Sequence, residues 1–423
     1  MRHIIVFTLL FLLSGLSANA NRHGESSRYP TYRGLVMTGY QGWFRVPGDG
    51  SGRGWVHYGE QGQFDPEHNT VEFWPDVSEY ERTYDTPFLK ADGMTAKVFS
   101  SFDKSTTDLH FKWMQQYQID GAFMQRFYGA AKNRNYLKSE NVIFENAVEA
   151  AAKYQRAIAV MYDLSGLTPG EDCSPIIEDW KELVDRMRIT SRGADQPYLY
   201  HDGHPVVGIW GVGFPDRPYD IHNIGLEQLI DFLHNDPEYG GCTVMLGVPA
   251  YFRDLNVDAT PDPYLQEIIR SADIIFPWFV QRFTPLLHND LQRYYHHVRK
   301  DVAWCNEASV DYAAVVYPGF SWNNLSQPDL KRFNPPGAIP RQIGSFYWGM
   351  IHMAIEAGAE MLYVAMFDEI DEGTCIFKCT NDTPVGEGVQ FLDYETAPSD
   401  YYLSLTQQAK IKLTNKLAEQ SQP

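Results

Sequence analysis

Short apolar runs alternate with helical patterns along most of the chain. The runs contain few polar residues, which is typical of parallel strands buried on both faces. Each run is followed by a segment whose apolar residues recur three and four positions apart, as on one face of a helix. The eight runs are 35–40, 122–127, 157–162, 206–210, 243–248, 274–279, 312–317 and 361–367. Eight strand–helix units predict a single (β/α)8 barrel, an α/β fold of the TIM type, and a doubly wound open sheet is the second interpretation.

The connection after the first run is much longer than the others. It extends from Gly42 to Met94, is rich in Gly, Trp and Tyr, and is followed by a further expected strand at 96–102. We expect this long first βα loop to decorate the mouth of the barrel. No linker or short repeat divides the chain, so residues 21–423 are expected to form one domain. Helices are expected at 108–117, 142–154, 176–187, 226–233, 263–269, 291–304, 343–356 and 400–417.

The N-terminus carries a basic residue, an apolar run and a cleavage pattern. Arg2 precedes the run Ile4–Leu13, and Ala18 and Ala20 form a small-x-small end. This order is typical of a secretory signal peptide, and the run is too short to span a bilayer. We therefore expect residues 1–20 to be removed and the mature protein to be secreted or periplasmic. No later run is long enough to span a membrane, so no membrane insertion is expected.

Composition and charge exclude several classes of protein. The chain has 423 residues, of which 44% are hydrophobic and 21% charged, as in ordinary globular proteins. Its formal net charge of −19 makes it a poor partner for nucleic acid or an anionic membrane. Aromatic residues make up 14% of the chain. Aromatic rings stack on sugars but also fill large cores, and composition alone favours the core. A monomer is expected.

Residues that could carry chemistry gather where the predicted strands end. The carboxyl ends of the strands form the active-site face of a (β/α)8 barrel. Aromatic, charged and amide side chains recur there and favour a sugar-binding site, although each one alone is more often core or rim. In chain order these residues are Tyr40, Gln41, Trp43, Gln125, Arg126, Tyr128, Tyr162, Asp163, Trp210, Tyr251, Arg253, Trp278, Gln281, Arg282, Tyr317, Trp322 and Asn323. Trp43, Trp210, Trp278 and Trp322 are the expected platforms for stacking on sugar rings.

The strongest local signal follows the last predicted strand. Asp368, Glu369, Asp371 and Glu372 place four carboxylates within five residues. Like charges this close raise the pKa of at least one group, and a pair with separated pKa values can act as acid and base in glycoside cleavage. A solvated acidic loop and a calcium site are the alternatives, although the spacing is not that of an EF-hand.

Other motifs carry less information. His201 and His204 precede the fourth strand, where a turn with hydrogen-bonded imidazoles is favoured over a metal site, although either ring could reach the mouth. Cys375 and Cys379 could bridge in an oxidising compartment, whereas the other three cysteines are expected to be buried thiols. The Gly-rich stretch 48–54 lacks the features of a phosphate loop. No cofactor and no metal ion are therefore expected.

The acidic stretch resembles a known signature. The residues from Glu369 to Thr374, Glu-Ile-Asp-Glu-Gly-Thr, are similar to the Glu-x-x-Glu-Gly-Thr signature of glycoside hydrolase family 99. That family contains endo-acting α-mannosidases and α-mannanases on a (β/α)8 barrel, and family 71, of α-1,3-glucanases, is similar in outline. The chain resembles more closely the bacterial family 71/99-like proteins often labelled xylosidase/arabinosidase. Four further stretches carry this resemblance, at 39–44, 247–253, 277–282 and 318–324.

The resemblance implies a carbohydrate substrate and a role for each glutamate. Glu369 would be the general base that removes the proton of the sugar 2-hydroxyl, and Glu372 would be the general acid that protonates the leaving oxygen. A 1,2-anhydro sugar would form and be opened by water, so the anomeric configuration would be retained. Ile370 and Asp371 depart from the aromatic residue and the His or Gly that usually separate these glutamates. The extra charge should raise the pKa of the acid, and the departure leaves the donor sugar open.

Three functions are compatible with these residues. The first is an exported, retaining glycoside hydrolase that cleaves an α-linked polysaccharide or oligosaccharide, with Arg126 or Arg282 keeping the base ionised. The second is a non-catalytic carbohydrate-binding barrel, and the third is a calcium-dependent structural module. The spacing of the two glutamates favours the hydrolase. The sugar and the linkage are not fixed, because loops determine the shape of the pocket.

Overall fold

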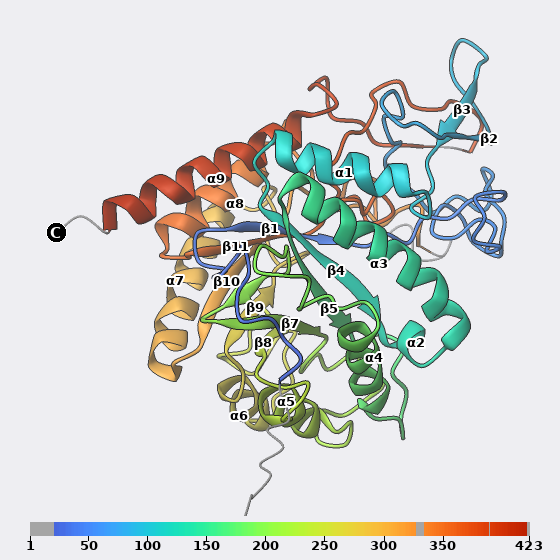
Figure 1. Cartoon of the computed structure of the whole chain (residues 1–423). Helices are drawn as coiled ribbons and strands as arrows, with labels where there is room; N and C mark the ends of the chain where they lie inside the picture. Colours follow the sequence, from blue (N-terminus) through green and yellow to red (C-terminus); the bar gives the residue numbers. More distant parts are fainter. Residues whose placement is uncertain (1–20, 327–333, 389, 421–423) are drawn as a thin grey trace, which may run out of the picture.

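The computed structural model describes residues 21–326, 334–388 and 390–420, which contain a closed barrel of eight parallel strands (Figure 1). The expected signal peptide, residues 1–20, lies outside the described residues. The barrel strands are β1 Val36–Tyr40, β4 Gly121–Phe127, β5 Ala157–Asp163, β7 His204–Trp210, β8 Thr243–Pro249, β9 Ile274–Trp278, β10 Asp311–Val316 and β11 Met361–Val364. The predicted (β/α)8 barrel is confirmed, and the open sheet is wrong.

Parallel pairing follows chain order around the barrel. β1 pairs with β4 on one side and with β11 on the other, so that Thr38 lies opposite Ala122 and Val364. The pairing of β5 with β7 completes the ring. Nearly all residues of these strands are buried, since each strand packs against the barrel interior on one face and against helices on the other. This double burial explains why the strands are continuous apolar runs.

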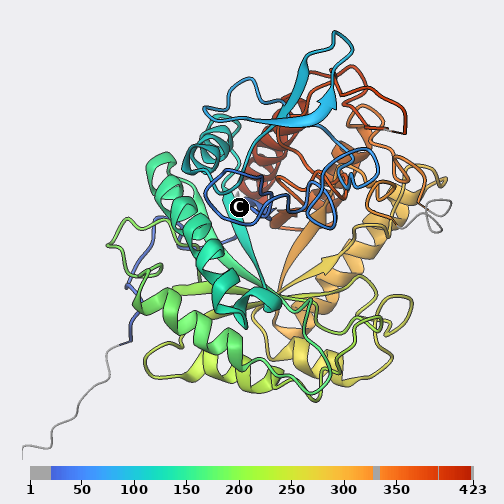
Figure 2. The ribbon, with the colours of Figure 1, turned by 90° about the vertical axis from the view of Figure 1, so that its right-hand side faces the viewer.

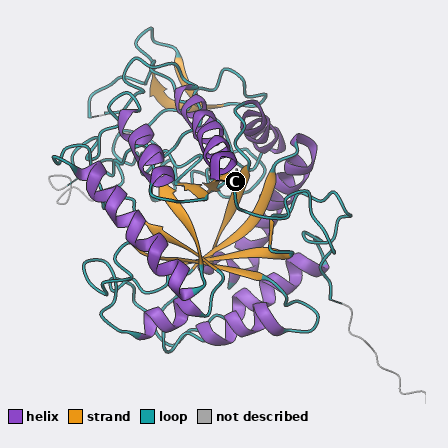
Figure 3. Cartoon of the chain, turned by 90° about the vertical axis from the view of Figure 1, so that its left-hand side faces the viewer, coloured by secondary structure: helices purple, strands orange, loops and turns teal. Residues whose placement is uncertain are grey.

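Helices cover the outside of the barrel (Figure 3). Each predicted helix is present, and the short α2 Tyr128–Ala131 was not expected. The helix α3 begins at Arg134 rather than 142, because the Asn133 side chain accepts hydrogen bonds from the first backbone N–H groups. The other helices are α1 Lys104–Gln116, α4 Ser174–Asp185, α5 Leu226–Asn235, α6 Tyr264–Arg270, α7 Asp290–Ala308, α8 Ser345–Glu356 and α9 Tyr401–Gln420, with α3 ending at Tyr154.

The long first βα loop forms a separate layer beside the mouth of the barrel. It contains an antiparallel hairpin of β2 Tyr84–Leu89 and β3 Thr95–Val98, at the top of the view in Figure 2. The strand expected at 96–102 is thus β3, outside the barrel as expected, and its partner β2 was not predicted. The backbone N–H of Glu72 donates to the carbonyl of Ile370 at 2.9 Å. The first loop is therefore fastened directly to the acidic segment that follows β11.

A second short hairpin closes the opposite, N-terminal end of the barrel. The strand β6 Tyr200–His201 pairs with the start of β7 through a turn at Asp202 and Gly203. The expected turn is present, and the suggestion that His201 or His204 reaches the mouth is wrong, because both lie at the other end of the strands. Within the described ranges, no helix combines the length and the apolar character needed to cross a membrane.

Candidate active site

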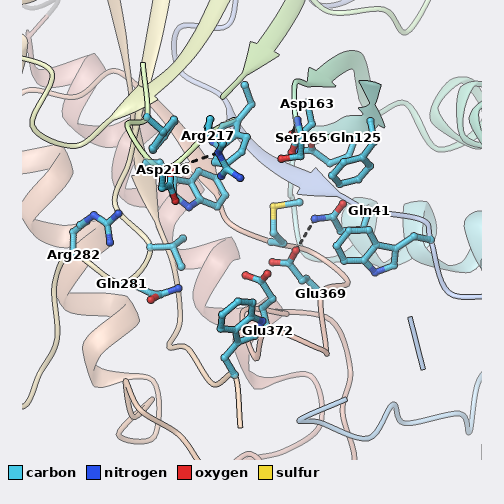
Figure 4. Close-up of a pocket in the computed structure, with 18 residues that line it drawn as sticks. Gln41, Gln125, Asp163, Ser165, Asp216, Arg217, Gln281, Arg282, Glu369 and Glu372 are labelled. Carbon is cyan, nitrogen blue, oxygen red and sulfur yellow. Dashed lines mark hydrogen bonds and ion pairs between the residues drawn. The ribbon is translucent and has the colours of Figure 1, made fainter. Parts of the chain in front are cut away.

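A cavity of about 550 Å³ opens at the C-terminal ends of the strands (Figure 4). Every barrel strand except β8 contributes to it, through its last residues or the loop that follows. The lining residues are Gln41, Trp43, Gln125, Phe127, Asp163, Ser165, Trp210, Phe214, Asp216, Arg217, Trp278, Val280, Gln281, Arg282, Trp322, Met366, Glu369 and Glu372. The position is the one at which (β/α)8 barrels place their active sites.

Asp368 anchors the acidic loop beneath this cavity. Its carboxylate is fully buried and accepts hydrogen bonds from the backbone N–H groups of Gln41 and Gly42, each at 2.8 Å. Burial raises the pKa of Asp368 to about 7, although these two hydrogen bonds act in the opposite direction. The carboxylate therefore ties the loop after β11 to the loop after β1 and does not face the cavity.

Glu369 is held firmly at the cavity wall. Its Oε1 accepts a hydrogen bond of 2.6 Å from Nε2 of Gln41, and its Oε2 accepts one of 2.5 Å from the hydroxyl of Thr374. Burial, and then the neighbouring charges of Glu372 and Asp371, raises the pKa of Glu369 well above its usual range. The two donors favour the ionised form, so they offset part of this effect and fix the orientation of the carboxylate.

Glu372 has different surroundings. Figure 4 shows its carboxyl group beside that of Glu369, facing the same space. Among the described residues no side chain or backbone N–H donates a hydrogen bond to its carboxylate. Burial raises the pKa of Glu372 to about 8, and the charges of Asp371 and Asp163 act in the same direction. The two glutamates therefore form a coupled pair that retains at least one proton near neutral pH.

Asp371 connects the acidic loop to the first βα loop. It is 1% exposed, and its Oδ2 lies 3.1 Å from Nδ1 of His57. The His57 ring stacks on Trp43 with ring centroids 3.7 Å apart, and Phe127 stacks on Trp43 at 5.5 Å. Trp43 is therefore already stacked on two aromatic rings of the protein.

The cavity wall contains buried polar atoms without partners. In the part of the chain that the structure describes, no hydrogen bond reaches Oε1 of Gln41, Nε1 of Trp43, Nε1 of Trp210 or Nε of Arg217. A buried polar group without a partner costs free energy, so native proteins retain few of them. These atoms belong to side chains that line the cavity, but the atoms themselves are covered by neighbouring protein atoms.

The wall opposite the glutamates carries mixed charge. Burial raises the pKa of Asp163 to about 6, despite a hydrogen bond to its Oδ1 from the backbone N–H of Ser165. The guanidinium group of Arg217 lies 5.0 Å from the Trp210 ring centre and 3.8 Å from Asp216. Arg282, in contrast, donates to Asp258 at 2.6 Å. Arg217 is thus the cavity cation that lowers the pKa of Glu372 through its charge.

The structure brings most of the predicted site residues together. Both glutamates line the cavity, as do all four tryptophans expected as platforms. The predicted residues found in its lining are Gln41, Trp43, Gln125, Asp163, Trp210, Trp278, Gln281, Arg282, Trp322, Glu369 and Glu372. Trp322 is 37% exposed, which makes it the most accessible of the four tryptophans.

Four predicted residues point outward from the strands and lie in the layer between barrel and helices, which corrects their expected position. Tyr40 hydrogen-bonds His110 of α1, and Tyr317 donates to the carbonyl of Phe283. Arg126 and Tyr162 both bind Asp179 of α4, at 2.6 and 2.9 Å. Side chains alternate between the two faces of a strand, so a neighbour of a cavity residue faces away. Arg126 is therefore not placed to keep the base ionised, and that expectation is wrong. Tyr128 is also buried, at the start of α2.

Three further predicted residues lie in the loops but outside this cavity, which is also a correction. Arg253 pairs with the buried Asp301, the hydroxyl of Tyr251 accepts from Arg293 at 3.2 Å, and Asn323 donates to a backbone carbonyl at 3.0 Å. Asp301 and Arg293 belong to α7, so helix residues bind two of these side chains and a backbone carbonyl binds the third.

Several cavity residues were not predicted. Phe127 could have been found by alternation, since it lies two positions after Gln125 on the same strand face. Met366 falls within the predicted run 361–367, but the strand ends at Val364. The others lie in irregular loops whose course has no periodic signal: Ser165, Phe214, Asp216, Arg217 and Val280.

All five cysteines are free thiols in this structure. Cys173, Cys242 and Cys305 are buried thiols, as expected. Cys375 and Cys379 are also free thiols in this structure, with their Sγ atoms 3.7 Å apart.

Comparison with known proteins supports the fold. No protein-family model and no curated protein matches the chain. Among solved structures, the GH99 endo-α-mannosidase of Bacteroides thetaiotaomicron in complex with bis-tris propane is similar over 92% of this chain and 100% of that one, with 15% identity and a TM-score of 0.63. Another structure of the GH99 endo-α-mannosidase from this organism has 16% identity and a TM-score of 0.62 over the same shares. At the level of fold, the chain is therefore similar to a GH99 glycoside hydrolase along nearly its whole length.

Proposed function

We propose that this protein is an exported glycoside hydrolase that cleaves an α-linked polysaccharide or oligosaccharide. The observation that carries the proposal is the placement of Glu369 and Glu372 in one cavity with opposite surroundings. Glu369 receives two hydrogen bonds, whereas the carboxyl group of Glu372 receives none and has a pKa raised to about 8. Two carboxyl groups that differ in this way can divide the roles of base and acid. The GH99 fold likeness and the expected signal peptide support the proposal.

Each glutamate has a role in this scheme. The pKa of both glutamates is raised, so the assignment rests on their hydrogen bonds and on the resemblance to family 99. Glu369, whose two donors favour the ionised form, is assigned as general base, and Glu372, which has no donor among the described residues and a pKa raised to about 8, as general acid. By the resemblance to family 99, Glu369 removes the proton of the sugar 2-hydroxyl, whose oxygen closes on C1 as the leaving oxygen takes a proton from Glu372. Water then opens the 1,2-anhydro sugar, and the anomeric configuration is retained. Gln41 and Thr374 hold Glu369 in place and are positioning residues.

The binding surface of the cavity fits this substrate class. Polar side chains of the lining, such as Gln281 and Asp163, can bind sugar hydroxyl groups, and the accessible ring of Trp322 can stack on a sugar face. The same features fit a carbohydrate-binding barrel without catalysis, so the test must separate the two functions. A calcium site in the acidic loop is not favoured, because Asp368, Glu369 and Asp371 already have protein partners.

The test is a screen for products. The purified mature chain is incubated with α-mannans, α-glucans, arabinans and xylans, and released sugars are detected by chromatography. We expect products from one class of α-linked glycan, and none from the variants Glu369→Gln and Glu372→Gln. Glu178→Gln, at a 73% exposed side chain on α4, is the matched control and should keep full activity. A glycan that binds without being cleaved would instead support the binding barrel.

A further inference from the structure

Directly after the acidic loop, the chain carries two buried thiols next to a buried cation. Cys375 and Cys379 are both inaccessible to solvent, and their Sγ atoms are 3.7 Å apart. Nη2 of Arg341 lies 3.6 Å from Sγ of Cys375. Neither thiol lines the cavity, and the mechanism proposed above does not use them.

Arg341 is unusual among the buried arginines of this protein. Its guanidinium group lies 4.3 Å from the ring centre of Phe73 and 4.5 Å from that of Tyr402, and it donates to the carbonyls of Gly373 and Cys375 at 2.9 and 2.7 Å. Within the described ranges it forms no ion pair with a carboxylate. A buried cation favours a nearby anion, and the Cys375 thiol is the group beside it that can become one.

The surroundings of Cys375 therefore favour its thiolate. Burial raises the pKa of the Cys375 thiol, but the hydrogen bond from Cys379 and the positive charge of Arg341 outweigh burial and lower it overall. Burial, together with the charge on Cys375, raises the pKa of Cys379 well above its usual range. One thiol of the pair is thus prepared as a nucleophile, and its neighbour remains a thiol at close range.

The pair joins two parts of the site. The backbone N–H of Cys375 donates to the carbonyl of Glu369 at 3.1 Å, and Cys379 forms an antiparallel bridge with Pro75 of the first βα loop. A covalent link between the two sulfurs would therefore close residues 375–379 into a rigid loop at the point where this segment pairs with the layer that covers it.

We propose that Cys375 and Cys379 are a redox-active pair that oxidises to a disulfide and thereby clamps the end of the acidic loop. The oxidant is a disulfide of a small thiol. The Cys375 thiolate attacks one of its sulfurs, forms a mixed disulfide and releases one thiolate. Cys379 then gives up its proton and attacks Sγ of Cys375, which releases the second thiolate. Counted from the two thiols, the pair loses two electrons and two protons, one of which Cys375 releases when it ionises before the attack. The two released thiolates take up these protons, so the external disulfide is reduced to two thiols.

The test uses the full mature chain and needs no substrate. Reduced protein is incubated with oxidised glutathione, once in its native state and once during refolding from urea. It is then denatured, treated with iodoacetamide and analysed by peptide mass spectrometry. We expect Cys375 and Cys379 to lose alkylation together and to recover it after reduction with dithiothreitol. In the native-state incubation the buried thiols of Cys173, Cys242 and Cys305 should remain available for alkylation after denaturation and serve as internal controls.

Two variants sharpen the test. In Cys379→Ser the mixed disulfide cannot be resolved, so glutathione should remain attached to Cys375, whereas Cys375→Ser should show much less glutathione at Cys379. Oxidation should raise the melting temperature of the native protein by about 2–4 °C and should have no such effect on either variant. Full alkylation of both cysteines after both incubations would overturn the proposal, and a disulfide without any rise in melting temperature would overturn the clamp.

Discussion

The two ends of the barrel both carry clusters of carboxylates, but the two clusters differ in whether their central carboxylates have cationic partners. At the N-terminal end, Oδ2 of Asp311 lies 2.7 Å from Nε2 of His201 and also binds Arg33, which in turn binds Asp202 at 2.8 Å. At the C-terminal end, Glu369 and Glu372 share a cavity, and neither forms an ion pair within the described part of the chain. In the first cluster Arg33 contacts both carboxylates, whereas in the second the two glutamates have no cationic partner among the residues that the structure describes.

This difference suggests that the N-terminal cluster stabilises the fold, whereas the C-terminal cluster serves proton transfer. Paired charges at the N-terminal end fasten β6, β10 and the segment before β1 to one another. At the other end burial, and then the neighbouring carboxyl groups, raises the pKa of Glu369 and Glu372, which destabilises the folded protein but provides a proton donor near neutral pH. His201, Asp202 and Asp311 are close enough together to hold a metal ion, but Arg33 already occupies their carboxylates. Substitutions at the two ends should therefore have opposite effects.

The largest effect is expected for Glu369→Gln. A general base contributes about 10²–10⁴-fold to the rate, and removal of the 2-hydroxyl proton is needed whatever the leaving group. Turnover should therefore fall by about that factor both on the glycan identified in the screen and on an activated aryl glycoside. Steady-state kinetics on both substrates are the measurement. If turnover stays near that of the wild type, Glu369 is not the base, and the C-terminal cluster is not distinguished from the N-terminal one by a catalytic role.

Asp311→Asn should have the opposite profile. The neutral amide weakens the contacts with His201 and Arg33, so the free energy of unfolding should fall by about 1–3 kcal/mol. The site is at the far end of the barrel, so kcat and KM should not change. Urea denaturation and kinetics on the same preparation test both parts. A large fall in kcat with unchanged stability would contradict the division between the two ends.

Glu372→Gln should make the protein more stable at high pH. The pKa of Glu372 is about 8 in the folded protein and 4.5 in the unfolded chain. Between these values the unfolded chain holds fewer protons than the folded protein, so the stability of the wild type falls as pH rises from 4.5 to 8. The variant lacks this loss and, allowing for partial exposure of the side chain, should be more stable by about 1–2 kcal/mol at pH 8. At pH 4.5 the two proteins should unfold at nearly the same urea concentration; an equal difference at both pH values would exclude titration of Glu372 as the cause.

The smallest effect is expected at the rim. Trp322→Ala removes the accessible stacking face and should raise KM about three- to tenfold with a smaller change in kcat. Trp348→Ala, on α8 outside the barrel, is the matched control and should leave KM unchanged. A fall in kcat larger than the rise in KM would show that Trp322 positions the reacting groups and does not simply bind a sugar.

The sequence predicts the barrel well because the physics behind it is repetitive. Strands buried on both faces leave continuous apolar runs, and amphipathic helices leave a regular period, so all eight units could be located. The hairpin strand β2 gave no such signal, because Tyr84–Leu89 alternates buried and exposed residues within a loop rich in turns. For the same reason, the first βα loop could be predicted to lie at the mouth of the barrel, but its internal structure could not.

Site residues were predictable where a strand determines the direction of their side chains, and less predictable in loops. Glu369 and Glu372 follow β11 directly and were found. Arg126 and Tyr162 were placed at the correct strand ends but on the wrong face, since one position along a strand separates cavity from helix layer. Arg217 could not be found, because it reaches the cavity from a loop after β7 whose path depends on packing with Trp210 and Phe214.

The most direct test of the assignment is the leaving-group dependence of Glu372→Gln. A protonated acid is needed to expel a sugar alkoxide but hardly at all for an activated phenol. We predict that kcat/KM falls by about 10²–10⁴-fold on the natural glycan and by less than about tenfold on the aryl glycoside. An equal loss on both substrates, or no loss on either, would contradict the role of Glu372 as the general acid.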